Sequence, residues 1–108
     1  MYVGTTGDRD VEVEKEVFSD DEKISFVIDN DNEIFNEPMI TVYYSKVDGE
    51  YEKLIYKFEI DIDPSHVWIH QPIKDASLSE GVADTTGVFN LRAYIGKDYF
   101  DEIQFTVE

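Results

Sequence analysis

The stretch GVFNLRAYIGKDYFDEIQFTVE, residues 87–108, decides the fold. Apolar and polar side chains alternate along both of its halves. One face collects Phe89, Leu91, Ala93 and Ile95 from the first half, and Ile103, Phe105 and Val107 from the second. A period of two is typical of a half-buried β-strand, and Gly96-Lys97-Asp98 supplies a tight turn between two such strands. The sequence therefore predicts an antiparallel hairpin that closes a sheet, with a bulge or an exposed start near Tyr99.

Further strands are predicted before this hairpin, over residues 11–17, 24–28, 39–46, 51–62 and 66–70. Asp48-Gly49 lies between two of them and is expected to supply the positive φ angles of a two-residue hairpin turn. The run from Tyr51 to Ile62 is longer than the usual strand of about 5–6 residues, so we expect a bend at which the chain passes from one sheet to the other. One face of this run is predicted to hold Leu54, Tyr56, Phe58, Ile60 and Ile62.

About seven strands with almost no helical periodicity predict an all-β fold, a two-sheet antiparallel β-sandwich. The first strand, with valines alternating with glutamates, is expected at a sheet edge. Residues 1–10, MYVGTTGDRD, are interpreted as a flexible lead, and residues 11–108 as a single β-sandwich domain. A chain of 108 residues is long enough to bury roughly 65% of its unfolded surface.

The ending from Gly87 to Val107, together with the Asp48-Gly49 hairpin and the long strand before it, resembles immunoglobulin-like and fibronectin-III-like modules of bacterial and archaeal surface proteins. The resemblance implies an immunoglobulin-like sandwich and says little about activity. Two departures are visible. Phe89 stands where many such modules carry a tyrosine that anchors a corner connection, and the paired cysteines of antibody domains are absent.

The charge balance restricts the partners. Asp and Glu number 25 against 9 Lys and Arg, which gives a formal net charge of −16. Nucleic acid and anionic membrane surfaces are disfavoured, because few cations are present to release counterions, whereas proteins and neutral ligands such as sugars remain open. No stretch approaches the roughly 20 apolar residues of a membrane helix, so no membrane insertion is expected. The oligomeric state is left open.

A polar loop after the second strand places oxygen-bearing side chains at Asp29, Asp31 and Glu33, a spacing that suggests a calcium loop. The remainder of an EF-hand is missing, because Ile34 stands where the glycine is required and Ile40 where the bidentate glutamate belongs. A solvated turn is the favoured interpretation. No metal and no cofactor are expected.

His66, Trp68 and His70 share one face of the short strand predicted at residues 66–70. Imidazoles four residues apart on a strand lie about 13 Å apart, too far to share one zinc ion. Two interpretations stay open. In the first, Trp68 packs at the rim of the core and the two histidines are exposed to solvent. In the second, these three residues and Tyr43 belong to an exposed aromatic patch that stacks on a ligand such as a sugar ring.

No catalytic motif is present, and carboxylates are so frequent that no acid–base pair stands out, so no catalytic residue is assigned and no enzyme is expected. We expect a non-catalytic module that acts as a binding or spacer domain of a larger surface or secreted protein. Its expected location is extracytoplasmic or at the cell surface, with the cytoplasm as the alternative. Two other functions stay open: a carbohydrate-recognition module, and an acidic intracellular or phage-derived protein-interaction domain.

Overall fold

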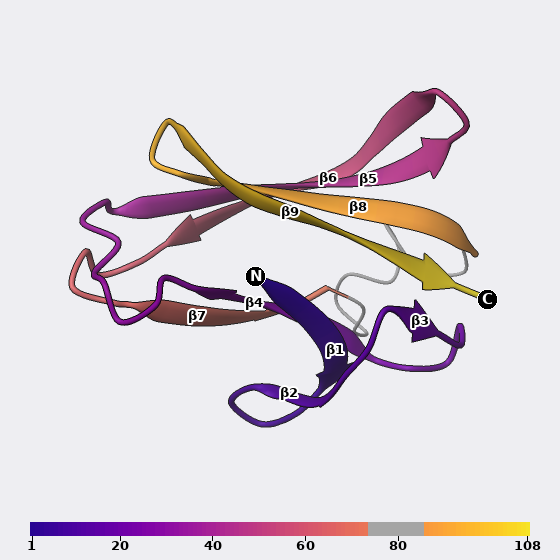
Figure 1. Ribbon diagram of the computed structural model, residues 1–108, viewed down its shortest axis with the longest axis horizontal. Helices are drawn as coiled ribbons and strands as arrows, with labels where there is room; N and C mark the ends of the chain where they lie inside the picture. The colour runs from indigo at the N-terminus through magenta and orange to yellow at the C-terminus, as the bar shows by residue number, and fades with distance from the viewer. Residues whose placement is uncertain (74–85) are drawn as a thin grey trace.

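The computed structural model describes residues 1–73 and 86–108, which form two β-sheets stacked face to face (Figure 1). The four-stranded sheet has the order β2-β1-β4-β7 and contains β1 (Tyr2–Thr6), β2 (Val11–Glu14), β4 (Ile24–Asp29) and β7 (Trp68–Pro72). The five-stranded sheet has the order β3-β9-β8-β5-β6 and contains β3 (Val17–Phe18), β5 (Met39–Asp48), β6 (Tyr51–Asp61), β8 (Gly87–Ile95) and β9 (Asp98–Val107). The predicted all-β sandwich is confirmed, and its described part has two more strands than expected.

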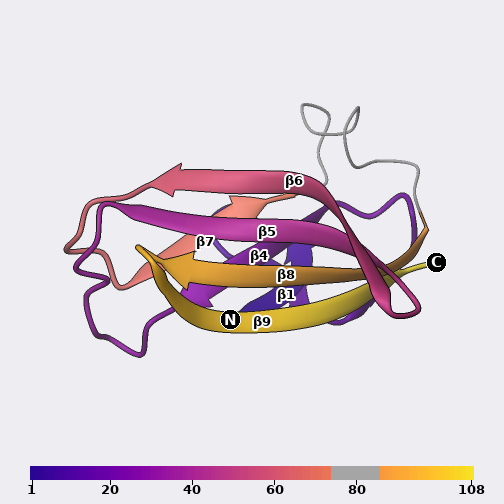
Figure 2. The ribbon, with the colours of Figure 1, turned by 90° about the horizontal axis from the view of Figure 1, so that it is seen from above.

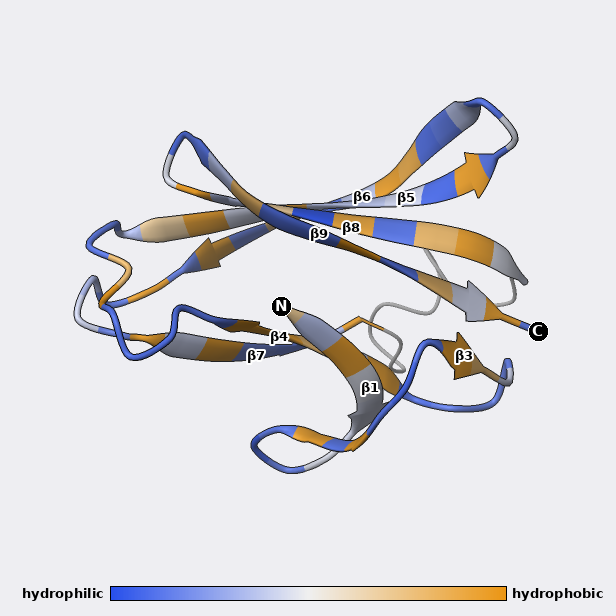
Figure 3. Ribbon diagram, in the orientation of Figure 1, coloured by the Kyte–Doolittle hydropathy of each residue, from blue (hydrophilic) through white to orange (hydrophobic). Residues whose placement is uncertain are grey.

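The C-terminal hairpin of β8 and β9 is confirmed. Gly96 has a φ of 61° and begins the turn, and Ile95 pairs with Asp98 across it. The predicted bulge is also present: Ala93 pairs with Asp101 and Tyr94 with Tyr99, which leaves Phe100 as an extra residue on β9. Bands of apolar and polar residues follow one another along both strands in Figure 3.

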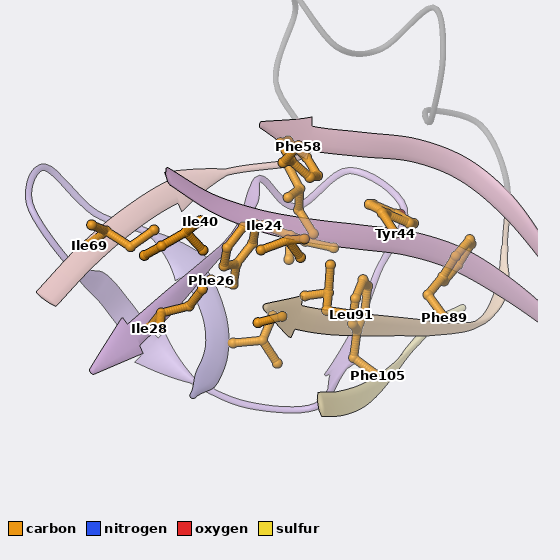
Figure 4. Close-up of a cluster of buried hydrophobic side chains, with 14 of the residues drawn as sticks. Ile24, Phe26, Ile28, Ile40, Tyr44, Phe58, Ile69, Phe89, Leu91 and Phe105 are labelled. Carbon is orange, nitrogen blue, oxygen red and sulfur yellow. The ribbon is translucent and has the colours of Figure 1, made fainter. Parts of the chain in front are cut away.

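One core fills the space between the sheets (Figure 4). Phe26 of the four-stranded sheet meets Phe58 of the five-stranded sheet edge to face, with ring centroids 5.5 Å apart. Phe18 meets Phe105 in the same way at 5.7 Å. Such pairs add about 0.5–1.5 kcal/mol each to the stabilisation from buried area. Leu91 and Phe105, predicted to face inward, are 0% and 1% exposed.

Residues 1–10 are not a lead outside the fold, which corrects the sequence prediction. Tyr2–Thr6 is β1, and it pairs with both β2 and β4, with Val3 fully buried. Gly4 has a packing role in this strand, because a Cβ at this position would collide with the carbonyl oxygen of Val13 on β2.

The valine–glutamate segment is divided between the two sheets. β2 forms an edge of the four-stranded sheet, as predicted, whereas β3 joins the five-stranded sheet and pairs parallel with β9. The parallel ladder includes hydrogen bonds from the Thr106 N–H to the Glu16 carbonyl and from the Glu108 N–H to the Phe18 carbonyl, each 2.8 Å long. The other described pairings are antiparallel.

β6 stays in the five-stranded sheet, so the prediction that this run passes from one sheet to the other is wrong. It pairs with β5 along its length, and the chain crosses to β7 through residues 62–67. Tyr44 pairs with Tyr56 and Ser45 with Leu54, so Ile55 is an extra residue that forms a bulge. The bulge reverses the alternation beyond it, and Leu54 is 51% exposed. Tyr56 keeps its parity but is also exposed, because β6 is an edge strand.

The β5–β6 hairpin is confirmed, but its turn lies one residue later than predicted. Asp48 pairs with Tyr51, which leaves Gly49 and Glu50 as the central residues. Gly49 has a φ of 62° and Glu50 has no positive φ, a pattern typical of a type II′ turn. Figure 2 shows the end of this hairpin swinging across β8 and β9.

Candidate functional site

The structure separates the predicted aromatic patch into two surfaces. Tyr43 lies on β5, on the outer face of the five-stranded sheet, because its neighbours Val42 and Tyr44 point into the core. Trp68 and His70 lie on β7, on the outer face of the opposite sheet. His66 precedes β7 in an exposed turn. The two outer faces point away from each other, so Tyr43 does not share a patch with Trp68.

The outer face of the five-stranded sheet carries a row of tyrosines, Tyr43, Tyr94 and Tyr99, which with Arg92 is here called the tyrosine face. Tyr43 and Tyr94 meet edge to face at 5.6 Å, and Tyr94 and Tyr99 do so at 5.9 Å. Lys57 Nζ lies 5.8 Å from the centre of the Tyr43 ring. Alternation along β5 and β8 places the first two tyrosines outward. The bulge at Phe100 brings Tyr99 beside Tyr94.

A hydrogen-bonded clamp holds the swung hairpin against this face. Arg92 Nη2 donates to Glu52 Oε2 at 3.2 Å and to Glu102 Oε2 at 3.3 Å. Asn90 Nδ2 donates to Glu52 Oε1 at 3.0 Å and to Glu102 Oε2 at 3.2 Å. Asn90 is 7% exposed even though it points away from the core. The two carboxylates satisfy its amide, and Glu52 thereby ties β6 to β8.

The surroundings of Glu102 and Arg92 favour the charged form of both side chains. Hydrogen bonding from Asn90 is the main reason that the pKa of Glu102 lies below its ordinary value, and Arg92 adds to the shift. The pKa of Arg92 is raised, chiefly by its hydrogen bond to Glu52. Partial burial and the nearby Glu102 carboxylate raise the pKa of Tyr99, which donates its hydroxyl to Glu102 Oε1 at 3.2 Å.

A shallow groove of about 510 Å³ opens on the tyrosine face, lined by Thr41, Tyr43, Arg92, Tyr94, Gly96 and Lys97. Two of the nine Lys and Arg side chains border it in a chain of net charge −16. The groove offers ring edges, phenolic hydroxyls and two cations. Such a surface can bind a partner.

The outer face of the four-stranded sheet carries a smaller cluster of Tyr2, Val27, Trp68 and His70, here called the tryptophan face. Trp68 and His70 stack with ring centroids 6.5 Å apart and an angle of 28°. His70 Nε2 lies 2.8 Å from the hydroxyl of Ser25, which is fully buried. Val27 is also fully buried and pairs with Tyr2 on one side and His70 on the other.

Tyr2 ties this face to the first hairpin. Its hydroxyl donates to Asp10 Oδ1 at 2.9 Å. Partial burial is the main cause of its raised pKa, and Asp10 and Asp29 add to it. Trp68 thus lies on an outer surface and not in the main core, and His70 is held by Ser25 while His66 is exposed. Neither sequence interpretation describes this arrangement fully.

The three residues considered as calcium ligands, Asp29, Asp31 and Glu33, lie in a turn. Asp29 Oδ1 accepts a hydrogen bond from the Asp31 N–H at 3.0 Å, and the Glu33 N–H donates to the Asn30 carbonyl at 2.9 Å. Asp31 and Asn32 adopt positive φ, as Asp and Asn do in turns. Within residues 1–73 and 86–108, no group of three or more His, Asp or Glu side chains is arranged to hold a metal ion.

Sequence reasoning missed Tyr2, Asn90, Arg92 and Glu102. The alternation along β8 could have indicated Asn90 and Arg92, because both side chains lie on the face opposite Leu91. The role of Glu52 has no such local signal, since it depends on how the hairpin curls in space. In the part of the chain that the structure describes, no helix has the length and apolar character to cross a membrane.

Comparison with known proteins supports the fold. Neither a protein-family model nor a curated protein matches the chain. The crystal structure of an immunoglobulin-like protein from Pseudomonas aeruginosa is similar, with a TM-score of 0.61 and 12% sequence identity, over 100% of this chain and 98% of that chain. The two stacked sheets and this likeness define the chain as an immunoglobulin-like β-sandwich. At this identity the likeness concerns the fold alone.

Proposed function

We propose that this chain is a non-catalytic immunoglobulin-like module that binds a protein partner through the tyrosine face. The observation that carries the proposal is the row of Tyr43, Tyr94 and Tyr99 beside Arg92 on one open sheet face. Tyr and Arg are enriched among the residues that dominate binding energy at protein interfaces. Tyrosine buries a large ring at a low cost in side-chain entropy.

Rigidity of the face supports the same proposal. Tyr43 and Tyr94 lie on the paired strands β5 and β8, near the middle of the five-stranded sheet. The clamp through Glu52, Asn90 and Arg92 fixes the hairpin that borders the face. A surface held in its binding geometry before contact loses less entropy on association. The carboxylates around it favour a partner with basic groups at its rim.

We propose in addition that the module belongs to a larger surface or secreted protein. The sequence resemblance to surface modules motivates this placement. A spacer role without a partner is the competing function. The experiment below distinguishes the two, because a spacer has no partner to cross-link at this face.

The proposal is tested by cross-linking in the native cell. A photoreactive phenylalanine analogue replaces Tyr94 in the full natural protein, and a second variant carries the analogue at Val13, which is 54% exposed on the opposite sheet. We expect a discrete cross-linked protein from position 94 and not from position 13. Adding Arg92→Ala should weaken that product several-fold. Identical products from both positions, or none from position 94, would contradict the proposal.

A further inference from the structure

A second surface, unconnected with the tyrosine face, has the features of a ligand site. Ser65, His66, Val67 and Trp68 line an open hollow of about 500 Å³ at the start of β7. The indole of Trp68 stacks with His70 and also borders this hollow. A partly exposed indole beside an open space offers a flat apolar surface to a ligand with an apolar face.

The loop that forms the hollow is held by three backbone hydrogen bonds from the loop between β4 and β5. The N–H groups of Asn30, Phe35 and Asn36 donate to the carbonyls of Val67, His66 and Pro64 at 2.9, 2.8 and 2.9 Å. Asp63 Oδ1 also accepts hydrogen bonds from the Ser65 N–H and hydroxyl, at 2.9 and 2.8 Å. The hollow is therefore a preformed feature of the fold.

A carboxylate lies beside the indole on the same outer face, next to the residues that line the hollow. Asp29 lies directly opposite Trp68 in the antiparallel pairing of β4 and β7, so their side chains share the outer face. Tyr2 donates its hydroxyl to Asp10, which brings a second carboxylate to this side of the molecule. Carboxylates accept strong hydrogen bonds from hydroxyl groups. The surface thus combines one aromatic plate with carboxylates at its border.

We infer that the hollow beside Trp68 binds a neutral saccharide. A sugar ring has a flat face of C–H groups that can stack on an indole, and a rim of hydroxyls that can donate to Asp29 and Asp10. The acidic border and the net charge of −16 repel uronic and sialic acids, so the charge pattern selects a neutral sugar.

Trp68 is the single tryptophan of the chain, so its fluorescence reports directly on the hollow. The probes are cellohexaose, xylohexaose, mannohexaose, laminarihexaose and chitohexaose, each titrated to about 10 mM, with oligogalacturonate as the anionic comparison. We expect a saturable change in emission with at least one neutral oligosaccharide and none with oligogalacturonate. Absence of a saturable response to all five neutral probes overturns the inference.

Variants assign the response to this hollow, with binding followed by calorimetry where the tryptophan is removed. Asp29→Asn should weaken binding about tenfold, the loss expected for one charge-assisted hydrogen bond. Trp68→Phe should weaken it further while preserving an aromatic side chain, and circular dichroism checks the fold of each variant. Tyr51→Ala, an 80% exposed position on β6 of the other sheet, should bind the sugar as the parent does. Loss of sugar binding in Tyr51→Ala with full binding in Asp29→Asn would overturn the inference and leave the cross-linking result untouched.

Discussion

At the scale of single residues, Ile55 determines which side chains of β6 reach the core. The alternation in the sequence puts Leu54 on the same face as Phe58. The extra residue between them reverses this, so Phe58 is 5% exposed and Leu54 is 51% exposed. Nothing in the composition of the run marks Ile55 as the bulged position. Strand alternation is thus predictable from sequence only between bulges.

Two leucines provide a matched test of this reversal. Leu91→Ala removes a fully buried side chain between the sheets and should lower the free energy of unfolding by about 2–5 kcal/mol. Leu54→Ala makes the same chemical change on the outer face and should cost within about 0.5 kcal/mol. Urea denaturation measures both losses of free energy, provided that the dependence of the unfolding free energy on urea concentration has the same slope in the parent and the variants. A comparable loss in the two variants would mean that Leu54 contributes to the core.

At the scale of elements, the hairpins were predictable and the path of the first 18 residues was not. Gly49 and Gly96 mark the two turns between alternating strands, which is a strong local signal. The segment from Val11 to Phe18 has one continuous pattern but serves two sheets. Its division depends on the distant strand β9, to which β3 pairs, and no local residue preference encodes that partner.

The clamp on the β5–β6 hairpin should contribute to stability in a pH-dependent way. Glu102 has a lowered pKa in the folded protein because Asn90 and Arg92 stabilise its charged form. Its contribution is therefore complete above the ordinary pKa of glutamate and is lost as the pH falls through the lowered folded value. We expect Glu102→Gln to melt below the parent at pH 7, with a difference that disappears on acidification toward pH ~3.

Thermal melts of the two proteins across this pH range measure the effect. Glu12→Gln removes an equal charge from β2 on the opposite sheet and serves as the control, because the net charge changes by the same amount. A melting-temperature difference that is constant over pH, or that Glu12→Gln reproduces, would show that the clamp is not its source.

At the scale of the whole molecule, the structure separates groups that the sequence places in one patch. Tyr43 and Trp68 were considered together as one exposed aromatic patch, with packing of Trp68 at the rim of the core as the alternative, and they lie on the outer faces of different sheets. Which sheet each belongs to depends on how the strands are ordered, β2-β1-β4-β7 and β3-β9-β8-β5-β6, and this order is a property of the complete fold. Because of this strand order, the molecule presents two separate aromatic faces.

The net charge of −16 on a molecule of 36 × 31 × 22 Å should make stability depend on salt. At about 10 mM salt the Debye length is about 30 Å, so charges repel one another across the entire molecule, whereas at about 150 mM it is about 8 Å. We expect the melting temperature to rise by several degrees between these conditions. Sodium and potassium chloride should act equally, and equal melting temperatures at both ionic strengths would exclude self-repulsion.

Melting temperatures in calcium chloride, at the same ionic strength as the sodium chloride samples, test for specific ion binding. Asp29, Asp31 and Glu33 form a hydrogen-bonded turn and not a convergent site, so we expect calcium to follow the sodium curve. A larger rise in melting temperature at millimolar calcium would instead indicate a specific carboxylate site. The comparison thus separates general screening from ion binding.

The parallel ladder between β3 and β9 has a consequence for the order in which the protein assembles. The ladder joins Val17 to Thr106 and Phe18 to Val107, so the two ends of a long intervening segment must come together before the ladder can form. During synthesis, β1 and β4 can associate early, whereas Val17 and Phe18 stay unpaired until β9 has emerged from the ribosome. A nascent chain that stalls before β9 therefore exposes Phe18, and this segment is where we expect a chaperone to bind.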